Sequence, residues 1–220
     1  MSNGKGAKCC LCSQIQGDAA NDLISKLLPE APYCRRIAIE SDHFAVVPSL
    51  GPLVPGHSLL CPKQHVKSFA DLDQRLTGEY RDFKAFVSER VGTVFDAPVH
   101  CFEHGSASGG SRIICTVDHA HLHLVPANVE VRSMLASDRR WIATSGDPLE
   151  LRVGTDGDEY LYYEDPHGSA LVACAAGQPF DSQHLRKLFA EALGRTEKWN
   201  WRDAPLPEEA DRAFRALVIR

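Results

Sequence analysis

The sequence predicts an α+β fold: a mostly antiparallel sheet, one long helix across it, and a mixed α/β C-terminal extension. Short apolar runs separated by turn residues lie between Arg36 and Pro62, and the apolar period changes to a helical one after Asp71. An antiparallel sheet covered on one face by a helix is an α+β arrangement.

The first expected strands are three short apolar runs. They lie at 36–40, 44–48 and 57–62, and are separated by Ser41-Asp42 and by the Gly-Pro-Leu-Val-Pro-Gly segment at 51–56. Turn residues between short strands favour direct antiparallel connections, so we expect a meander.

The next element is an amphipathic helix from Asp71 to about Phe95. Its apolar residues fall three or four apart, as one helical face requires: Leu72, Leu76, Tyr80, Phe83, Val87, Val91 and Val94. We expect it to lie across the sheet. Strands at 99–103, 112–116 and 119–125 then follow, with a Gly/Ser loop at 105–111 between the first two.

The C-terminal part has a looser pattern. We expect strands near 160–163 and 170–174, a helix from Ser182 to Leu193 closed by Gly194, and a short helix near Pro207. No charge run or long Pro/Ser linker separates this part from the rest. The expected organisation is therefore a flexible tail at 1–8, a domain at 9–126, and an extension at 127–220 packed on it.

Composition excludes several classes of protein. The chain has 220 residues with a formal charge of −5, which argues against a general nucleic-acid binder. It has neither a run of about 20 apolar residues nor a secretory signal, so we expect a cytoplasmic protein without a membrane partner. Eight cysteines in a chain of this kind do not predict a disulfide framework.

Three histidines carry the strongest chemical signal. His119, His121 and His123 alternate with apolar residues, so a strand would place all three on one face. Two chemistries remain open from the residues alone. The imidazoles can together ligate a catalytic metal, or one can attack an electrophile such as phosphorus while its neighbours set its tautomer.

The segment His-Ala-His-Leu-His-Leu-Val at 119–125 resembles the His-φ-His-φ-His-φ-φ pattern of histidine triad (HIT) nucleotide hydrolases and transferases, where φ is apolar. Phe44-Ala-Val-Val-Pro and Pro55-Gly-His-Ser-Leu-Leu-Cys-Pro-Lys-Gln-His65 resemble the paired strands that precede the triad in that family. The resemblance covers about residues 9 to 126. It implies a HIT-like fold, a small nucleotide substrate and a homodimer.

The resemblance also implies residue roles. His121 is the expected nucleophile, which forms a covalent nucleotidyl-histidine, and His123 contacts the phosphoryl oxygens or the leaving group. His119 completes the catalytic triad, while His57 and Thr116 are expected on the phosphate.

One position departs from the family pattern, because Cys115 replaces the glutamine that many members carry before the triad. Cysteine is a poor hydrogen-bond partner. Glu103, His104 and the Gly109–Gly110 loop are candidates to replace that contact, and for Glu103 and His104 an ordinary strand end is the alternative interpretation.

Histidine at the third triad position is typical of the hydrolase branches of the family. We therefore expect a nucleotide hydrolase acting on a nucleoside phosphoramidate or phosphoanhydride, without an organic cofactor. One alternative is a nucleotidyltransferase with a non-water acceptor. Another is a non-catalytic nucleotide- or zinc-binding protein.

The N-terminal cysteines suggest a metal. Cys9 and Cys12 have the C-x-x-C spacing that binds zinc, although redox chemistry also uses it. In relatives that begin with C-x-x-C, zinc is completed by the histidine of Pro-Lys-x-His and by the first triad histidine, which here are His65 and His119. The resemblance thus implies a structural Cys₂His₂ zinc. The segments from Ser182 to Arg186 and from Trp199 to Arg202 resemble extensions of some bacterial members, and we expect both tryptophans, Trp199 and Trp201, in the core.

Overall fold

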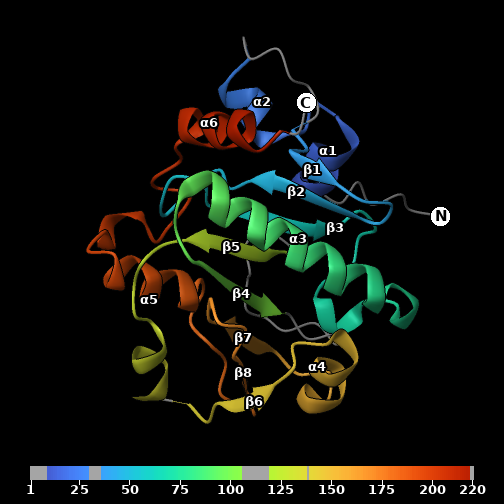
Figure 1. The fold of residues 1–220 in the computed structure, drawn as a ribbon, viewed down its shortest axis with the longest axis vertical. Coiled ribbons are helices and arrows are strands. Elements are labelled where there is room, and N and C mark those ends of the chain that lie inside the picture. The colour runs from blue at the N-terminus through green and yellow to red at the C-terminus, as the bar shows by residue number, and fades with distance from the viewer. Residues whose placement is uncertain (1–8, 30–35, 106–118, 138, 219–220) are drawn as a thin grey trace, which may run out of the picture.

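The computed structural model describes residues 9–29, 36–105, 119–137 and 139–218 (Figure 1). Its strands form one eight-stranded sheet in the order β1-β2-β3-β5-β4-β7-β8-β6, and every neighbouring pair is antiparallel. The strands are β1 (Ile39–Glu40), β2 (Phe44–Pro48), β3 (Ser58–Pro62), β4 (Val99–Gly105), β5 (Leu122–Pro126), β6 (Ile142–Thr144), β7 (Tyr160–Glu164) and β8 (Ala170–Cys174). The predicted α+β class is confirmed.

Six α-helices accompany the sheet in the described ranges. They are α1 (Cys10–Gln16), α2 (Leu23–Leu27), α3 (Thr77–Phe95), α4 (Pro148–Thr155), α5 (His184–Ala192) and α6 (Pro207–Leu217). The long helix begins at Thr77 instead of Asp71, because short 3-10 turns occupy 69–71 and 74–76. The sequence did not predict four short elements: α1, α2, α4 and the three-residue β6. Such short elements contain too few residues for a clear apolar period. The strand expected at 112–116 lies outside the described residues.

The expected meander is present, and its register is set by β2 and β3. Phe44 pairs with Pro62, and Pro48 pairs with Ser58. The turn before β3 contains Gly56 at φ +84°, where an added Cβ would lie within 2.4–2.7 Å of the Phe95 ring. Only glycine fits there without strain or a clash, so this position fixes how the chain enters β3.

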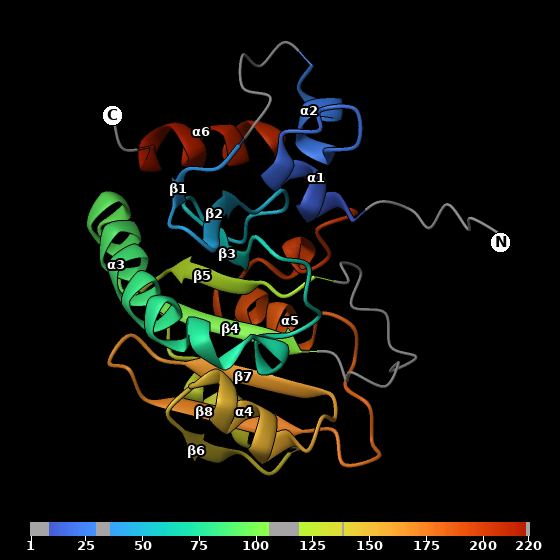
Figure 2. The ribbon, with the colours of Figure 1, turned by 90° about the vertical axis from the view of Figure 1, so that its right-hand side faces the viewer.

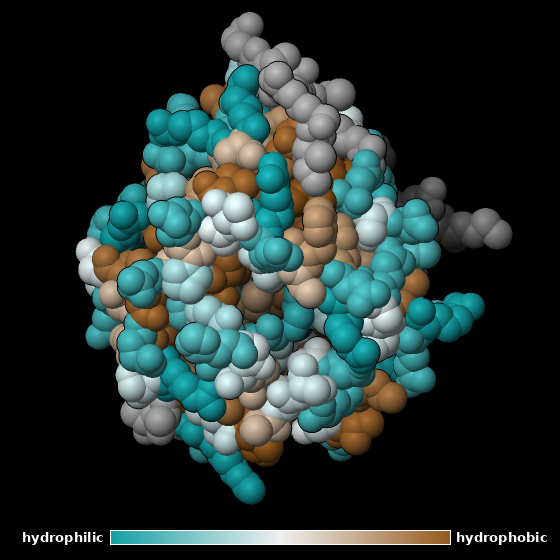
Figure 3. Space-filling view, viewed as in Figure 1, coloured by the Kyte–Doolittle hydropathy of each residue, from teal (hydrophilic) through white to brown (hydrophobic). Residues whose placement is uncertain are grey.

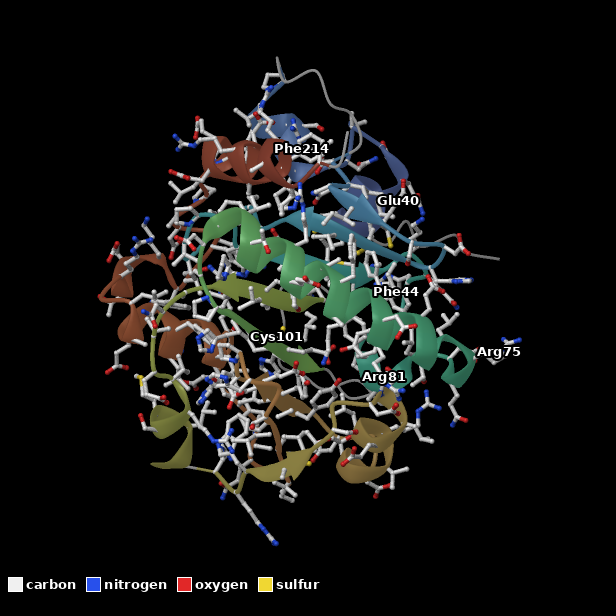
Figure 4. The ribbon with its side chains drawn as sticks, in the orientation of Figure 1. Glu40, Phe44, Arg75, Arg81, Cys101 and Phe214 are labelled. Carbon is white, nitrogen blue, oxygen red and sulfur yellow. The ribbon has the colours of Figure 1, made fainter. Side chains whose placement is uncertain are left out.

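Helices cover both faces of the sheet. Figure 2 shows α3 on one side and α1 and α5 on the other. Phe44 and Cys101 of the sheet lie beneath α3, and Phe214 of α6 joins the same apolar cluster (Figure 4). On the opposite face, Phe189 of α5 packs against Phe102 of β4. Alternation along the strands thus places apolar side chains on both faces of the sheet.

The extension joins the same sheet as the first part. Its strand β7 pairs with β4 over five residues, Cys101–Gly105 against Tyr160–Glu164. We call this pairing the seam. The boundary predicted at residue 126 stays a prediction, but hydrogen bonding across the seam is continuous.

The face that carries α3 mixes hydrophilic and hydrophobic side chains (Figure 3). Phe86, on the outer side of α3, is 46% exposed. In the part of the chain described by the structure, no helix is both long and apolar enough to cross a membrane.

Candidate functional site

The three triad histidines are not stacked along one strand, which corrects the expectation from their alternation. β5 begins at Leu122, so only His123 belongs to it. His119 and His121 lie in an irregular segment, which is held by a hydrogen bond of 2.7 Å from the Ala120 N–H to the Val66 carbonyl. Because of this bend, His119 and His121 lie among different residues.

The ring of His121 is fixed in one tautomer. Its Nδ1 lies 2.7 Å from the carbonyl oxygen of His119, and a carbonyl only accepts, so Nδ1–H is the donor. In the neutral ring this leaves the lone pair on Nε2. Burial lowers the pKa of His121, which keeps the ring neutral near pH 7.

A second chain of hydrogen bonds sets the tautomers of His57 and His123. The backbone N–H of Leu53 donates to Nδ1 of His57 over 3.0 Å. His57 Nε2–H therefore donates to Nδ1 of His123, 2.8 Å away. With Nδ1 as an acceptor, neutral His123 carries its proton on Nε2.

The surroundings keep these rings uncharged. Burial is the largest cause that holds the pKa of His57 and of His123 well below the usual range, and the positive charge of Arg186 adds to it. Phe102 stacks on His123 with ring centroids 4.3 Å apart. The rings of His121 and His123 meet edge to face at 5.0 Å. The arrangement therefore offers one free imidazole nitrogen and one N–H donor.

A cavity of about 70 Å³ opens beside His121 and His123. Its wall combines the N-terminal helices, the β2–β3 region and the extension: Cys10, Leu11, Gln14, Asp22, Leu23, Ile24, Pro48, Ser49, Leu50, Gly51, Leu59, His121, His123, Arg186 and Trp201. Sequence reasoning gave no signal for Gln14. Arg186 and Trp201 stood out only through the resemblance of the extension, and the tryptophan was interpreted as a core residue.

The predicted metal ligands come together. One ligand atom from each of Cys9, Cys12, His65 and His119 lies within 4.8 Å of the others. Cys12 Sγ is 3.3 Å from Nδ1 of both histidines, and Cys9 Sγ is 3.6 Å from Nδ1 of His119. His119 donates Nε2–H to the carbonyl of Pro62 over 2.8 Å, so its Nδ1 lone pair faces the two sulfurs. This is a possible metal-binding group.

Two expected substrate contacts have other outcomes. Thr116 lies outside the described residues. His104 lies at the end of β4, where its Nε2 is 2.6 Å from a carboxylate oxygen of Glu159. Its role in binding substrate stays a prediction.

Comparison with known proteins finds a family match for part of the chain. Residues 33–129 match the model of the HIT domain. A bis(5'-adenosyl)-triphosphatase of Dictyostelium discoideum is 32% identical over 90 residues, which cover 38% of this chain and 53% of that protein. The chain thus spans about half the length of the curated relative it matches. The family resemblance predicted from the sequence is confirmed by this match to the HIT domain over residues 33–129.

Solved structures with a similar fold include three histidine triad proteins. One from Sulfolobus tokodaii is 23% identical, covers 47% of this chain and 66% of that chain, and has a TM-score of 0.35. A HIT family member from Bacillus subtilis is 18% identical, with coverages of 60% and 87% and a TM-score of 0.40. A zinc-bound member from Mycobacterium smegmatis is 24% identical, with coverages of 66% and 88% and a TM-score of 0.37.

Proposed function

We propose that the protein is a nucleotide hydrolase that cleaves a nucleoside phosphoramidate or phosphoanhydride through a covalent nucleotidyl group on His121. The observation that carries this proposal is the tautomer of His121, whose Nδ1–H is bound to the His119 carbonyl. Its Nε2 lone pair is left for attack on phosphorus. The family, and a relative described as a bis(5'-adenosyl)-triphosphatase, support the substrate class.

In the first step Nε2 of His121 attacks the α-phosphorus. A phosphorus–nitrogen bond forms, and the bond from phosphorus to the leaving group breaks with its electron pair. In the second step water forms a phosphorus–oxygen bond, the bond to Nε2 breaks, a proton goes to solvent, and a nucleoside monophosphate leaves. The low pKa of His121 supports this role, because only the neutral ring is nucleophilic.

His123 would stabilise the charge on the transferring phosphoryl group. Its Nε2–H is the free donor, since Nδ1 accepts from His57. His57 in turn is oriented by the Leu53 N–H. Donors fixed in advance are worth most where charge develops in a dry site.

We further propose that Cys9, Cys12, His65 and His119 hold a structural zinc ion. The ligand spacing fits, because sulfur and nitrogen ligands of one tetrahedral zinc lie about 3.6 Å apart. Burial and the neighbouring Cys9 sulfur raise the pKa of Cys12 to about 12, so a thiolate pair here needs a compensating cation. Bound zinc would supply a cross-link from α1 to the segment that carries His121, without entering the chemistry. The homodimer and the cytoplasmic location stay predictions.

The test is turnover by purified protein of diadenosine triphosphate and of adenosine phosphoramidate. We expect His121→Asn to lower kcat by about 10³-fold or more, because no other group replaces a nucleophile. His43→Asn is the control, since His43 is exposed and pairs with Glu79 outside the cavity. Equal turnover by His121→Asn and the wild-type protein contradicts the proposal.

A further inference from the structure

The extension places a buried cation in the wall of the cavity. Arg186 of α5 is 4% exposed. Its Nε donates to the carbonyl of Trp199 at 2.8 Å, and its Nη2 donates to the carbonyls of Gly51 at 2.7 Å and Lys198 at 3.2 Å. All three acceptors are neutral, so these bonds fix the guanidinium without neutralising it.

Arg186 forms no ion pair with a described residue. Asp22, the carboxylate in the same cavity wall, instead accepts from the N–H groups of Ile24 and Ser25. Desolvation lowers the pKa of Arg186 to about 10, which still leaves it protonated at neutral pH. Nη1 makes no hydrogen bond with a described residue, while the other two nitrogens are committed. An isolated buried charge is costly unless it is paired, so this position favours an anion.

The same guanidinium lies in one cavity wall with the proposed nucleophile. Arg186 lines the cavity with His121 and His123, and its positive charge contributes to the lowered pKa of both rings. Gly51, whose carbonyl accepts from Nη2, packs closely against the extension, because a Cβ added at Gly51 would lie 2.5 Å from Cβ of Trp201. The loop that accepts from Nη2 and the extension are thus in tight contact.

We propose that Arg186 binds the phosphate of the substrate beside His121, so that the extension completes a site whose histidines belong to the HIT domain. This inference rests on the proposed function and adds its phosphate-binding cation. A planar guanidinium bonds phosphate oxygens in a charge-assisted way that a neutral donor does not match. It also stabilises negative charge on a transferring phosphoryl group.

The experiment compares binding of AMP and of adenosine by calorimetry to wild-type protein, Arg186→Gln and Arg186→Lys. We expect Arg186→Gln to lower the affinity for AMP by about 10- to 100-fold, because AMP carries the phosphate charge. Its affinity for adenosine, which has no charge, should stay within about 3-fold of that of wild type. The AMP affinity of Arg186→Lys should lie between those of wild type and Arg186→Gln, since lysine keeps the positive charge but loses the forked N–H donors of the guanidinium. A structural role alone would affect adenosine and AMP equally.

Arg195→Gln is the matched control. Arg195 also anchors the β2–β3 loop, through Nη1 to the Leu53 carbonyl at 2.8 Å, but does not line the cavity. We expect its AMP affinity to stay within about 3-fold of wild type. Thermal unfolding measures whether each variant is folded. If Arg186→Gln is unfolded, the comparison of AMP with adenosine is made on Arg186→Lys instead.

The outcomes separate this inference from the proposed function. Unchanged AMP affinity in Arg186→Gln, or an equal loss in Arg195→Gln, overturns the role of Arg186 and leaves turnover through His121 intact. Absence of AMP binding by wild-type protein also overturns it. If AMP binding depends on Arg186 but no nucleotide is turned over, the role of Arg186 in binding phosphate is supported and the proposed hydrolase activity is refuted.

Discussion

Two regions of the molecule share one topology, yet only one of them carries the triad histidines. The first runs β3-α3-β4-β5 and the second β6-α4-β7-β8, and their strands lie in the matching orders β3-β5-β4 and β6-β8-β7. They meet at the seam, where Glu103 of β4 lies opposite Tyr162 of β7. Because β4 and β7 are antiparallel and the strand orders match, the topology places the two regions about this pair in a two-fold arrangement.

The matching positions differ in chemistry. His123 pairs with Phe102 in the first region, and the two-fold arrangement places Ala173, which pairs with Leu161, in the corresponding position of the second. The second helix is also shorter, at 8 residues against 19. The scaffold alone therefore does not define the site. The second region instead covers β4 and leads the chain into α5, which bears Arg186.

Metal binding should separate the regions most sharply. We expect one zinc per chain in wild-type protein, none in Cys12→Ala, and a melting temperature lowered by several degrees or more, because a structural zinc contributes directly to folding. Elemental analysis and thermal unfolding measure both. Cys174→Ala, the same change on β8 of the second region, should keep the zinc. Zinc retained by Cys12→Ala contradicts the proposed ligand set.

The seam should make the two regions unfold together. Leu161 on β7 is fully buried between them, so Leu161→Ala should cost roughly 2–5 kcal/mol of unfolding free energy while a single transition remains. Denaturant unfolding followed by fluorescence and circular dichroism tests this. Leu149→Ala, at a residue that is 43% exposed, should cost far less. Two separate transitions would show that the regions fold independently.

A buried carboxyl at the seam should make stability depend on pH. Burial raises the pKa of Glu103 to about 7, although Tyr160 Oη–H and the Phe69 N–H donate to it. Between the unfolded pKa near 4.5 and about 7, the folded state holds a proton that the unfolded state has lost. The unfolding free energy should therefore fall with rising pH across this window, by up to about 3 kcal/mol.

Glu103→Gln removes this contribution, so its unfolding free energy should fall less than that of wild type between those pH values. Denaturant titrations at several pH values give the difference, in which the histidines common to both proteins cancel. Parallel curves for the two proteins would mean that Glu103 is ionised throughout the window.

The smallest expected effect comes from introducing a histidine at the corresponding position of the second region. Ala173→His should lower stability by roughly 1–3 kcal/mol, because Ala173 is 1% exposed and the added ring overpacks the core. It should create no second reactive histidine, which labelling with a nucleotide substrate and peptide mapping would detect. A nucleotide adduct at residue 173 would show that a histidine at this position of the scaffold is enough to make it reactive.

The long elements of this fold were predictable, and the short ones were not. The face containing Tyr80, Phe83 and Val87 identified α3, because many turns repeat one period. α1 and α2 have 7 and 5 residues, and their burial depends on contacts with distant strands. Tertiary contacts also bend the triad segment, where the Ala120 N–H to Val66 bond overrides the strand that alternation predicts.

The residues of the candidate site were predictable where they belong to one recognisable sequence motif. The alternation of the histidines identified the triad. The C-x-x-C spacing identified two cysteines of the possible metal group, and the family resemblance added His65 and His119. Arg186 reaches the cavity from 63 positions beyond His123 through the seam and α5, and no local pattern encodes that path.

The most direct test of the account is the intact mass of the protein quenched during turnover of adenosine phosphoramidate. The account predicts an acid-labile adduct of one adenylyl group, mapped to His121, that decays to AMP and is absent from His121→Ala. Turnover without this adduct, or an adduct mapped to His123 instead, would contradict His121 as the nucleophile.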